Sequence, residues 1–289
     1  MKNVLFTGVC TALVTPFVDG KVNYPMLEML LKRQLEAGIK AVVLAGTTGE
    51  APTLSDDEKL EIFRRGKAYV GDQMTVIAGT GSNDTTHAVE LSKKAAQTGV
   101  DGLLIVSPYY NKATDTGLIA HYSAIAAATT LPVIIYNVPG RTGVDIPVSV
   151  YKALSQIPNI AGVKEASGSI TKVAKIKAAC GAGFPIWSGN DDMIAPVISV
   201  GGQGVISVLS NVAPLETRYL TEAALDGDFD TASSLQCRLM ELIDLLFCEV
   251  NPIPVKAAMK LLGYDCGPCR LPLTDMKAEN LQKLQNIVG

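Results

Sequence analysis

The sequence predicts an α/β fold, a (β/α)8 TIM barrel followed by an all-helical C-terminal appendage. Short apolar runs rich in β-branched residues alternate with amphipathic helical stretches along residues 1–225. Each run is almost continuously apolar, as expected for parallel strands that are covered on both faces. The chain has 289 residues, somewhat more than the roughly 250 that such a barrel needs, which leaves room for the appendage.

The apolar runs give the expected strands in order. They cover residues 9–13, 41–45, 75–78, 102–106, 133–136, 160–164, 185–188 and 205–208. Eight strand–helix units predict a closed barrel. A doubly wound sheet is the alternative, and it would leave eight strands with an open edge.

The helices between the strands carry local start and stop signals. Ser55 and Glu58 form a capping box that opens a helix through Tyr69. A second helix is expected at residues 84–97, where Gly99 ends it.

The pattern changes near residue 226. Residues 228–289 contain no strand candidate, and helices are expected at 229–247, 254–262 and 274–287. We therefore expect a catalytic barrel at residues 1–225 and a three-helix region at 226–289.

Composition excludes several classes of protein. With 48% hydrophobic and 18% charged residues, the chain has the balance of a folded globular protein rather than a disordered one. The net charge of −3 offers no overall basic field, so neither nucleic acid nor an anionic membrane surface is an expected partner. No apolar run approaches the roughly 18 residues that span a bilayer. The N-terminal residues do not form a signal peptide, so the cytoplasm is the expected location.

The cysteines and histidines give weak signals for redox or metal chemistry. Cys266 and Cys269 form a C-x-x-C pair, which can be redox-active or bind zinc, but a second pair is absent and nearby Gly and Pro residues mark a loop. We therefore interpret this segment as a loop between helices. The two histidines, His87 and His121, have no metal-ligand spacing, so no metal site is expected.

In a TIM barrel the chemistry lies at the carboxyl ends of the strands. The second predicted strand ends in Gly-Thr-Thr-Gly-Glu at residues 46–50. Its backbone amides and the hydroxyls of Thr47 and Thr48 suit a small carboxylate or oxyanion. The alternative is a tight strand–helix turn with local threonine caps.

The fourth and fifth predicted strands end in aromatic and basic residues. Tyr109 and Tyr110 follow the fourth strand and either bind substrate, pack against another subunit, or cover their own turn. Tyr136 ends the fifth strand and points into the barrel if Ile134 does. Arg141 lies in the following glycine-flanked loop, where it either grips a carboxylate or forms a surface salt bridge.

The sixth predicted strand ends at Lys164. This lysine is expected to share a face with Ile160 and Gly162, where the glycine leaves room for a long side chain. A lysine desolvated in the barrel offers a neutral amine as a nucleophile. Because strands five and six are neighbours, Tyr136 and Lys164 are expected to lie close together.

These motifs in combination resemble the dihydrodipicolinate synthase family nearly end to end. The matching segments are residues 46–50, 136–143, 162–164, 188–191, 204–207 and 251–254. The resemblance implies that Lys164 forms a Schiff base with pyruvate, with no other cofactor. It also implies that Thr47 and Thr48 hold the pyruvate carboxylate, and that backbone at Gly189 and Ile206 lines the pocket.

The resemblance further implies a second substrate and an assembly. The pyruvate enamine would attack L-aspartate 4-semialdehyde, whose carboxylate Arg141 would grip, in the first committed step of diaminopimelate and lysine biosynthesis. Tyr136, Thr47 or Thr48, and Tyr110 from a neighbouring subunit would relay protons. A homotetramer built from tight dimers is typical of the family, and the sequence does not distinguish dimer from tetramer.

Two other functions remain as alternatives. The wider superfamily contains N-acetylneuraminate lyase and aldolases for keto-deoxy-sugar acids, in which Arg141 would have no purpose. A non-catalytic regulatory barrel is the other, and the joint presence of Lys164, Tyr136 and Arg141 speaks against it.

The resemblance also bears on feedback by L-lysine. Lysine-sensitive relatives bind it at a dimer interface, where the matching positions are Ala51, Pro52, Asp56, Lys59, Asn83, His87 and Tyr109. Sensitive enzymes tend to carry His at the position of Lys59 and Glu at the position of His87. Here Lys59 adds a positive charge that repels the ammonium groups of lysine, and His87 replaces a carboxylate that would attract them. We therefore expect insensitivity to lysine.

Overall fold

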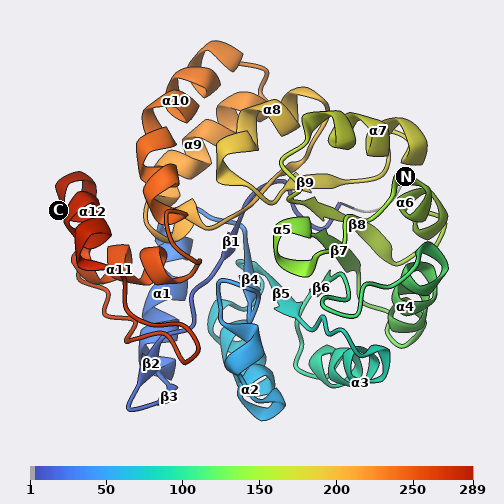
Figure 1. Ribbon diagram of the computed structural model, residues 1–289, viewed down its shortest axis with the longest axis horizontal. Coiled ribbons are helices and arrows are strands. Elements are labelled where there is room, and N and C mark those ends of the chain that lie inside the picture. The colour runs from blue at the N-terminus through green and yellow to red at the C-terminus, as the bar shows by residue number, and fades with distance from the viewer. Residues whose placement is uncertain (1–3, 289) are drawn as a thin grey trace.

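The computed structural model describes residues 4–288, which contain a closed barrel of eight parallel strands surrounded by helices (Figure 1). Strands adjacent along the chain are adjacent in the barrel, and β1 closes the ring between β4 and β10. The barrel strands are β1 (Gly8–Ala12), β4 (Ala41–Leu44), β5 (Thr75–Gly79), β6 (Gly102–Val106), β7 (Val133–Asn137), β8 (Ile160–Glu165), β9 (Ile186–Ser188) and β10 (Gly204–Ser207).

The predicted barrel is confirmed, and each predicted strand lies within one residue of its observed bounds. The open doubly wound alternative is wrong because the ladder closes from β4 through β1 to β10. The sequence missed a separate antiparallel hairpin of β2 (Phe17–Val18) and β3 (Lys21–Val22), whose two-residue strands are too short to show a pattern. Asp19 and Gly20 have positive φ and form its tight turn.

The helices fall into three groups. Those packed around the barrel are α1 (Tyr24–Glu36), α2 (Asp56–Val70), α3 (Thr85–Ala96), α4 (Asp115–Ala127), α6 (Val148–Leu154), α7 (Ile170–Cys180), α8 (Ile194–Ser199) and α9 (Pro214–Leu225). Short turns of helix follow strand ends at η1 (Ala51–Thr53), α5 (Pro139–Thr142), η2 (Asp191–Met193) and η3 (Leu209–Asn211). The C-terminal helices are α10 (Phe229–Leu246), α11 (Ile253–Leu261) and α12 (Ala278–Val288).

Hydrogen bonds at the N-termini explain where two of these helices begin. In α2, Ser55 Oγ accepts from the Glu58 N–H at 3.2 Å, and Glu58 accepts from the Ser55 N–H at 2.9 Å, which confirms the predicted capping box. By contrast, α12 begins four residues after the predicted start at residue 274. The Glu249 carboxylate accepts from the Lys277 N–H at 3.0 Å and so caps the helix from a distant loop.

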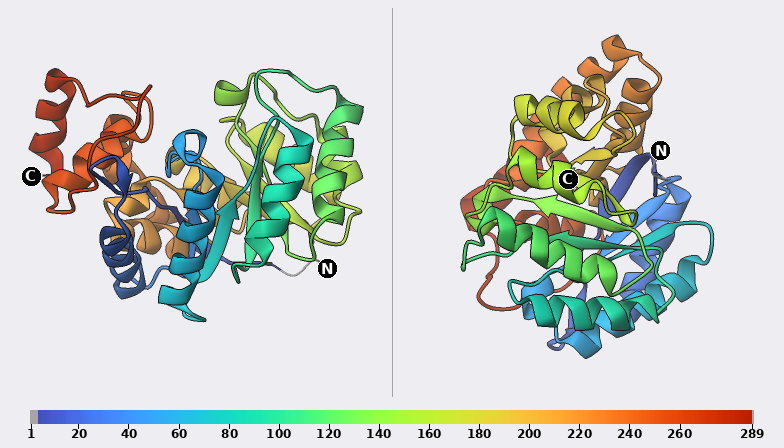
Figure 2. Two further views of the ribbon diagram at one scale, coloured as in Figure 1. Left: turned by 90° about the horizontal axis from the view of Figure 1, so that it is seen from below. Right: turned by 90° about the vertical axis from the view of Figure 1, so that its right-hand side faces the viewer.

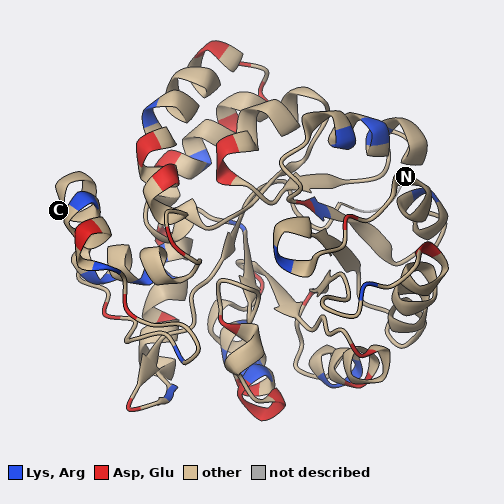
Figure 3. Cartoon of the chain, viewed as in Figure 1, with Lys and Arg blue, Asp and Glu red and all other residues tan. Residues whose placement is uncertain are grey.

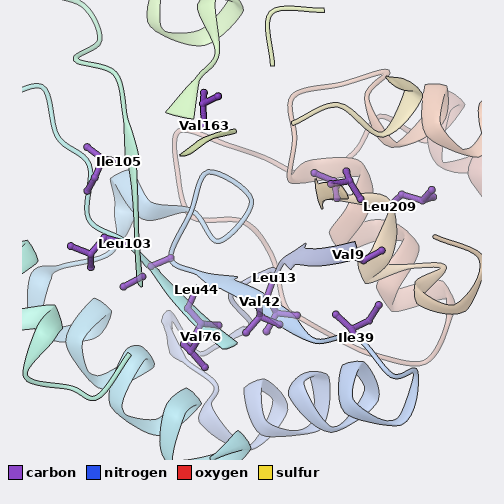
Figure 4. Close-up of a cluster of buried hydrophobic side chains, with 14 of the residues drawn as sticks. Val9, Leu13, Ile39, Val42, Leu44, Val76, Leu103, Ile105, Val163 and Leu209 are labelled. Carbon is purple, nitrogen blue, oxygen red and sulfur yellow. The ribbon is translucent and has the colours of Figure 1, made fainter. Parts of the chain in front are cut away.

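Apolar side chains form two layers, one on each side of the strands. The inner layer fills the barrel and includes Cys10, Ile77, Ile134 and Tyr136, while the outer layer lies between strands and helices. Figure 4 shows part of the outer layer, where Val42, Leu44 and Val76 lie close to one another. Complete burial of such side chains contributes about 1.5–3 kcal/mol each. Because successive side chains of a strand point to opposite faces, every second strand residue faces the barrel interior.

One strand departs from strict alternation. The β7–β8 register shifts at Ala161, which faces the inner layer, and Ile160 belongs to the outer layer. The expectation that Ile160 shares a face with Lys164 is therefore wrong, because the extra residue of a bulge reverses the alternation. A Cβ at Gly162 would lie 2.4 Å from the Pro185 carbonyl oxygen and 2.9 Å from the Trp187 ring, so this glycine makes room for the neighbouring strand rather than for the lysine.

The C-terminal helices lie on one side of the barrel (Figure 2), and the loop after α11 contacts the β2–β3 hairpin. The Phe17 N–H donates to the Cys266 carbonyl at 2.9 Å, which fastens the two segments together. Gly267 has a φ of +67°, and a Cβ there would lie 2.1 Å from the Phe17 carbonyl oxygen, so the contact requires glycine. The described residues after 226 contain only helices and loops, as predicted; their status as a separate domain stays a prediction.

Charges of both signs are distributed over the outer helices (Figure 3). This mixture agrees with the small net charge of −3. None of the described helices is long and apolar enough to cross a membrane.

Candidate active site

A cavity of about 460 Å³ opens at the carboxyl ends of strands β4 to β7. Thr47, Tyr109, Tyr136 and Arg141 all contribute to its wall, so four residues predicted from three strand ends meet at one place. Parallel strands of a barrel end at the same face, which explains why these segments converge.

Lys164 and Tyr136 lie side by side in the mouth of the barrel. The two residues pair in register across β7 and β8, and both side chains are almost completely buried. Lys164 Nζ lies 4.2 Å from the centroid of the Tyr136 ring. The predicted proximity is therefore confirmed, and the phenol faces the barrel interior together with Ile134.

Gly189 and Ile206 lie on the two strands that follow. A Cβ at Gly189 would lie 3.1 Å from Lys164 Cε and 2.6 Å from Ala166 Cβ, so only glycine allows the lysine side chain to pass so close to this backbone. The Gly189 N–H donates to the Glu165 carbonyl at 2.8 Å and extends the β8–β9 pairing beyond β9. Ile206 is completely buried in the inner layer.

Asp191, which sequence reasoning did not select, links the segments that follow β9 and β10. Its Oδ2 accepts from the backbone N–H groups of Val208 at 3.0 Å and Leu209 at 2.9 Å, just after Ile206. Burial raises the pKa of the Asp191 carboxyl, and hydrogen bonds and the charge of Lys164 oppose that rise. The signal in the sequence was its position three residues after the end of the strand at Ser188.

The threonines of the 46–50 loop have different surroundings. Thr47 is half-buried and lines the cavity. Thr48 is buried, and its Oγ1 accepts from Asn251 Nδ2 at 3.0 Å. The loop is folded back by a hydrogen bond from the Ala51 N–H to the Gly46 carbonyl at 3.1 Å. The loop therefore places Thr47 at the cavity wall, and it joins Thr48 to Asn251 in the C-terminal region by a hydrogen bond.

Glu50, the last residue of this loop, is a second anchor. Its Oε1 accepts from Lys256 Nζ at 2.8 Å in a buried ion pair, and its Oε2 accepts from the Arg270 N–H at 2.8 Å. Removal of one partner of such a pair is strongly destabilising because it leaves a buried charge. Sequence reasoning missed these contacts because they join residues more than 200 positions apart.

Arg141 lies on α5 with an exposed side chain. Its Nη2 donates to the Asn251 carbonyl at 3.2 Å, and within residues 4–288 it forms no ion pair, so the alternative of a surface salt bridge is wrong. Asn251 thus contacts both Thr48 and Arg141. A guanidinium without a carboxylate partner beside the cavity is suited to bind an anionic ligand.

The two tyrosines after β6 are not brought to Lys164 by this chain. Tyr109 lines the cavity, and its carbonyl accepts from Asn83 Nδ2 at 3.2 Å. Tyr110 is 90% exposed and has a φ of +72°. The role of Tyr110 in the site of a neighbouring subunit stays a prediction.

The same cavity extends to Asp56, Lys59 and His87. The Asp56 carboxylate lies 3.0 Å from His87 Nε2 and 3.7 Å from Lys59 Nζ. Burial lowers the pKa of Lys59, and Asp56 opposes this shift. The carboxylate in this part of the cavity is therefore already engaged by two basic side chains.

The Cys266–Cys269 segment is a loop, as predicted. Both thiols are free, and burial raises the pKa of Cys266 to about 12 and that of Cys269 to about 11. Thiols with such pKa values are poor nucleophiles at neutral pH. Among the described residues, no cluster of His, Cys, Asp or Glu is arranged to hold a metal ion.

With this geometry in place, comparison with known proteins decides the family. Residues 5–289 match the model of the Dihydrodipicolinate synthetase family. The chain belongs to this family. It is 50% identical over 282 residues to the 4-hydroxy-tetrahydrodipicolinate synthase of Caldicellulosiruptor saccharolyticus, covering 97% of this chain and 95% of the relative. The enzyme of the same name from Acetivibrio thermocellus is 46% identical over 285 residues, covering 99% and 97%.

Solved structures of dihydrodipicolinate synthases agree. The Aquifex aeolicus structure has a TM-score of 0.96 at 41% identity and covers 98% of this chain and 97% of that chain. A structure from Cyanidioschyzon merolae with lysine bound has a TM-score of 0.95 at 44% identity and covers 98% and 97%. The family, the TIM-barrel fold and the lyase class expected from the sequence are confirmed.

Proposed function

We propose that this chain condenses pyruvate with L-aspartate 4-semialdehyde through a Schiff base on Lys164, giving 4-hydroxy-tetrahydrodipicolinate for diaminopimelate and lysine biosynthesis. The observation that carries the proposal is the buried Lys164 amine at the mouth of the barrel, 4.2 Å from the centroid of the Tyr136 ring. The lysine side chain passes close to the backbone of Gly189, where a Cβ would crowd it. Family membership supports the same reaction.

The first half of the reaction uses the amine. Lys164 Nζ attacks the carbonyl carbon of pyruvate, and loss of water leaves an iminium. The iminium withdraws electrons, so the methyl carbon loses a proton and becomes an enamine carbon nucleophile. Thr47, Thr48 and nearby backbone amides hold the carboxylate, while the backbone at Gly189 and Ile206 shapes the pocket.

The second half uses the acid–base groups. The enamine attacks the aldehyde carbon of L-aspartate 4-semialdehyde, and the new oxyanion takes a proton. Attack of the substrate amine on the iminium carbon then closes the ring and releases Lys164. Tyr136, Thr47 or Thr48, and Tyr110 of a neighbouring copy relay the protons, and Arg141 binds the substrate carboxylate. These steps need no metal or other cofactor because the iminium itself is the electron sink.

A coupled assay with the purified protein tests the proposal. We expect turnover with pyruvate and L-aspartate 4-semialdehyde together, and none when either is omitted. Cleavage of N-acetylneuraminate or of a keto-deoxy-sugar acid, without turnover of the semialdehyde, would favour the other branch of the superfamily and contradict the proposal.

Assembly gives a second prediction. Because Tyr110 is 90% exposed in one chain, we propose that its hydroxyl acts in the site of a second copy in a homodimer or homotetramer. Tyr110→Phe is expected to lower kcat by roughly tenfold, since water partly replaces the lost hydroxyl, with an unchanged melting temperature. The matched control is Tyr219→Phe, an exposed tyrosine on α9. A fully active monomer in analytical ultracentrifugation would contradict the shared site.

Regulation gives a third prediction. Lysine at millimolar concentration is expected to leave activity nearly unchanged. Its ammonium groups would meet Lys59, a like charge that costs about 1 kcal/mol at ~4 Å in water, and an Asp56 that His87 and Lys59 already engage. The coupled assay with and without L-lysine checks this. Strong inhibition would mean that Asp56 compensates for the absent carboxylate or that lysine binds elsewhere.

A further inference from the structure

A buried cluster of polar side chains lies on the outer side of strands β7 and β8, and the proposed reaction gives it no role. Asn137, Glu165 and Tyr151 form the cluster, with Asp145 at its edge. Asn137 and Tyr151 are fully buried, and Glu165 is 4% exposed. A carboxylate is rarely buried so deeply unless hydrogen bonds replace its lost water.

Four hydrogen bonds hold the Glu165 carboxylate. Asn137 Nδ2 donates to Oε1 at 3.0 Å and to Oε2 at 3.2 Å. The Tyr151 hydroxyl donates to Oε2 at 3.2 Å, and the Ser167 N–H donates to Oε1 at 2.8 Å. Asn137 is fixed on its other side, because its Oδ1 accepts from the Ile146 N–H at 3.0 Å. The cluster thus joins β7, β8, the loop after β8 and helix α6 (Figure 1).

The cluster is in register with the proposed catalytic pair. Across β7 and β8, Tyr136 pairs with Lys164, and the next residues, Asn137 and Glu165, pair with each other. Successive side chains of a strand point to opposite faces, so one pair faces the barrel interior and the other faces the helices. A slide of β7 along β8 would break the outer hydrogen bonds and displace Tyr136 from Lys164 by the same distance.

We propose that Asn137 and Glu165 are positioning residues that hold Lys164 Nζ against the Tyr136 ring. This inference rests on the proposed function, since it takes Lys164 and Tyr136 as the reacting pair. Displacement of reacting groups by about 1 Å costs up to about 10²-fold in rate, so the loss of the outer hydrogen bonds acts on the chemical step.

The chain offers a matched control at the opposite end of the same strands. Asn159 Nδ2 donates to the backbone carbonyls of Ala126, Thr129 and Leu131 at 2.9, 3.0 and 3.3 Å. Asn159 precedes β8, far from the carboxyl ends that carry the site. Asn159→Ala therefore removes comparable hydrogen bonds without touching the register at Lys164.

The test compares kcat, pyruvate KM, melting temperature and the rate at which borohydride traps a pyruvate adduct. Asn137→Ala is expected to lower kcat and the trapping rate by roughly tenfold or more, with pyruvate KM within about threefold of native. Asn159→Ala is expected to lower the melting temperature similarly and to keep kcat within about twofold of native.

Two variants of Glu165 separate the effect of its hydrogen bonds from the effect of its packing. In Glu165→Gln, Oε1 still accepts from Asn137 and Ser167, and the new amide donates to the Tyr151 hydroxyl, which also accepts hydrogen bonds. This variant is expected to keep kcat within about fivefold of native, whereas Glu165→Leu loses at least as much as Asn137→Ala.

Equal kcat losses in Asn137→Ala and Asn159→Ala would overturn the inference and leave the cluster a purely structural one. If Asn137→Ala does not fold, Tyr151→Phe replaces it, because it removes one donor to Glu165 and keeps the ring; native kcat in that variant would also overturn the inference. A native protein that forms no adduct on Lys164 refutes the proposed function itself. A normal native adduct with normal rates in the variants refutes only the positioning role.

Discussion

Lys164→Ala is expected to abolish synthase activity, with a loss of roughly 10⁴-fold or more in kcat, because it removes the amine that would form the Schiff base. The coupled assay with pyruvate and L-aspartate 4-semialdehyde measures this loss. The variant is expected to fold normally, since it removes a buried amine and leaves the outer hydrogen bonds of β8 intact.

The matched control for this prediction is Lys112→Ala. Lys112 is an exposed lysine in the loop after β6, near the same mouth of the barrel, where its Cε would lie 3.2 Å from a Cβ at Gly143. We expect nearly native activity in this variant. Residual activity of more than a few per cent in Lys164→Ala, at a native melting temperature, would contradict the assignment of the nucleophile.

Arg141→Ala is expected to raise the KM for L-aspartate 4-semialdehyde by roughly 10- to 150-fold, the loss of a charged hydrogen bond worth about 1.5–3 kcal/mol. Formation of the pyruvate adduct is expected to stay near native, since Arg141 contacts Asn251 rather than Lys164. Steady-state kinetics with each substrate varied in turn separates the two effects.

Arg238→Ala on helix α10, an exposed arginine outside the cavity, is the control for the loss of one positive charge. It is expected to leave both KM values unchanged. Unchanged semialdehyde kinetics in Arg141→Ala would count against a carboxylate site at this residue and would favour the sugar-acid interpretation.

The barrel was predictable from sequence because both of its main signals are local. Continuous apolar runs mark strands buried on two faces, and the capping box of Ser55 and Glu58 marks the start of a helix. The proximity of Tyr136 and Lys164 followed from the rule that consecutive parallel strands lie side by side, and the register confirms it.

The errors and omissions have physical causes of two kinds. The bulge at Ala161 is a shift in the pairing of β8 with β7 and leaves no signal in the residues of β8 alone, so strict alternation gave the wrong face for Ile160. Asn251 and Lys256 were not selected because they act through contacts with Thr48 and Glu50, more than 200 positions away. No periodic pattern reports such contacts.

The central claim is that the Lys164 amine is the nucleophile toward pyruvate, and the most direct measurement is the site of a borohydride-reduced adduct. The native protein is incubated with pyruvate and sodium borohydride, digested, and analysed by mass spectrometry. We predict a reduced pyruvate adduct on the peptide that contains Lys164 and none in the protein treated without pyruvate. An adduct on Lys112 or Lys256 instead, or no adduct in a protein that is active in the coupled assay, would contradict the account.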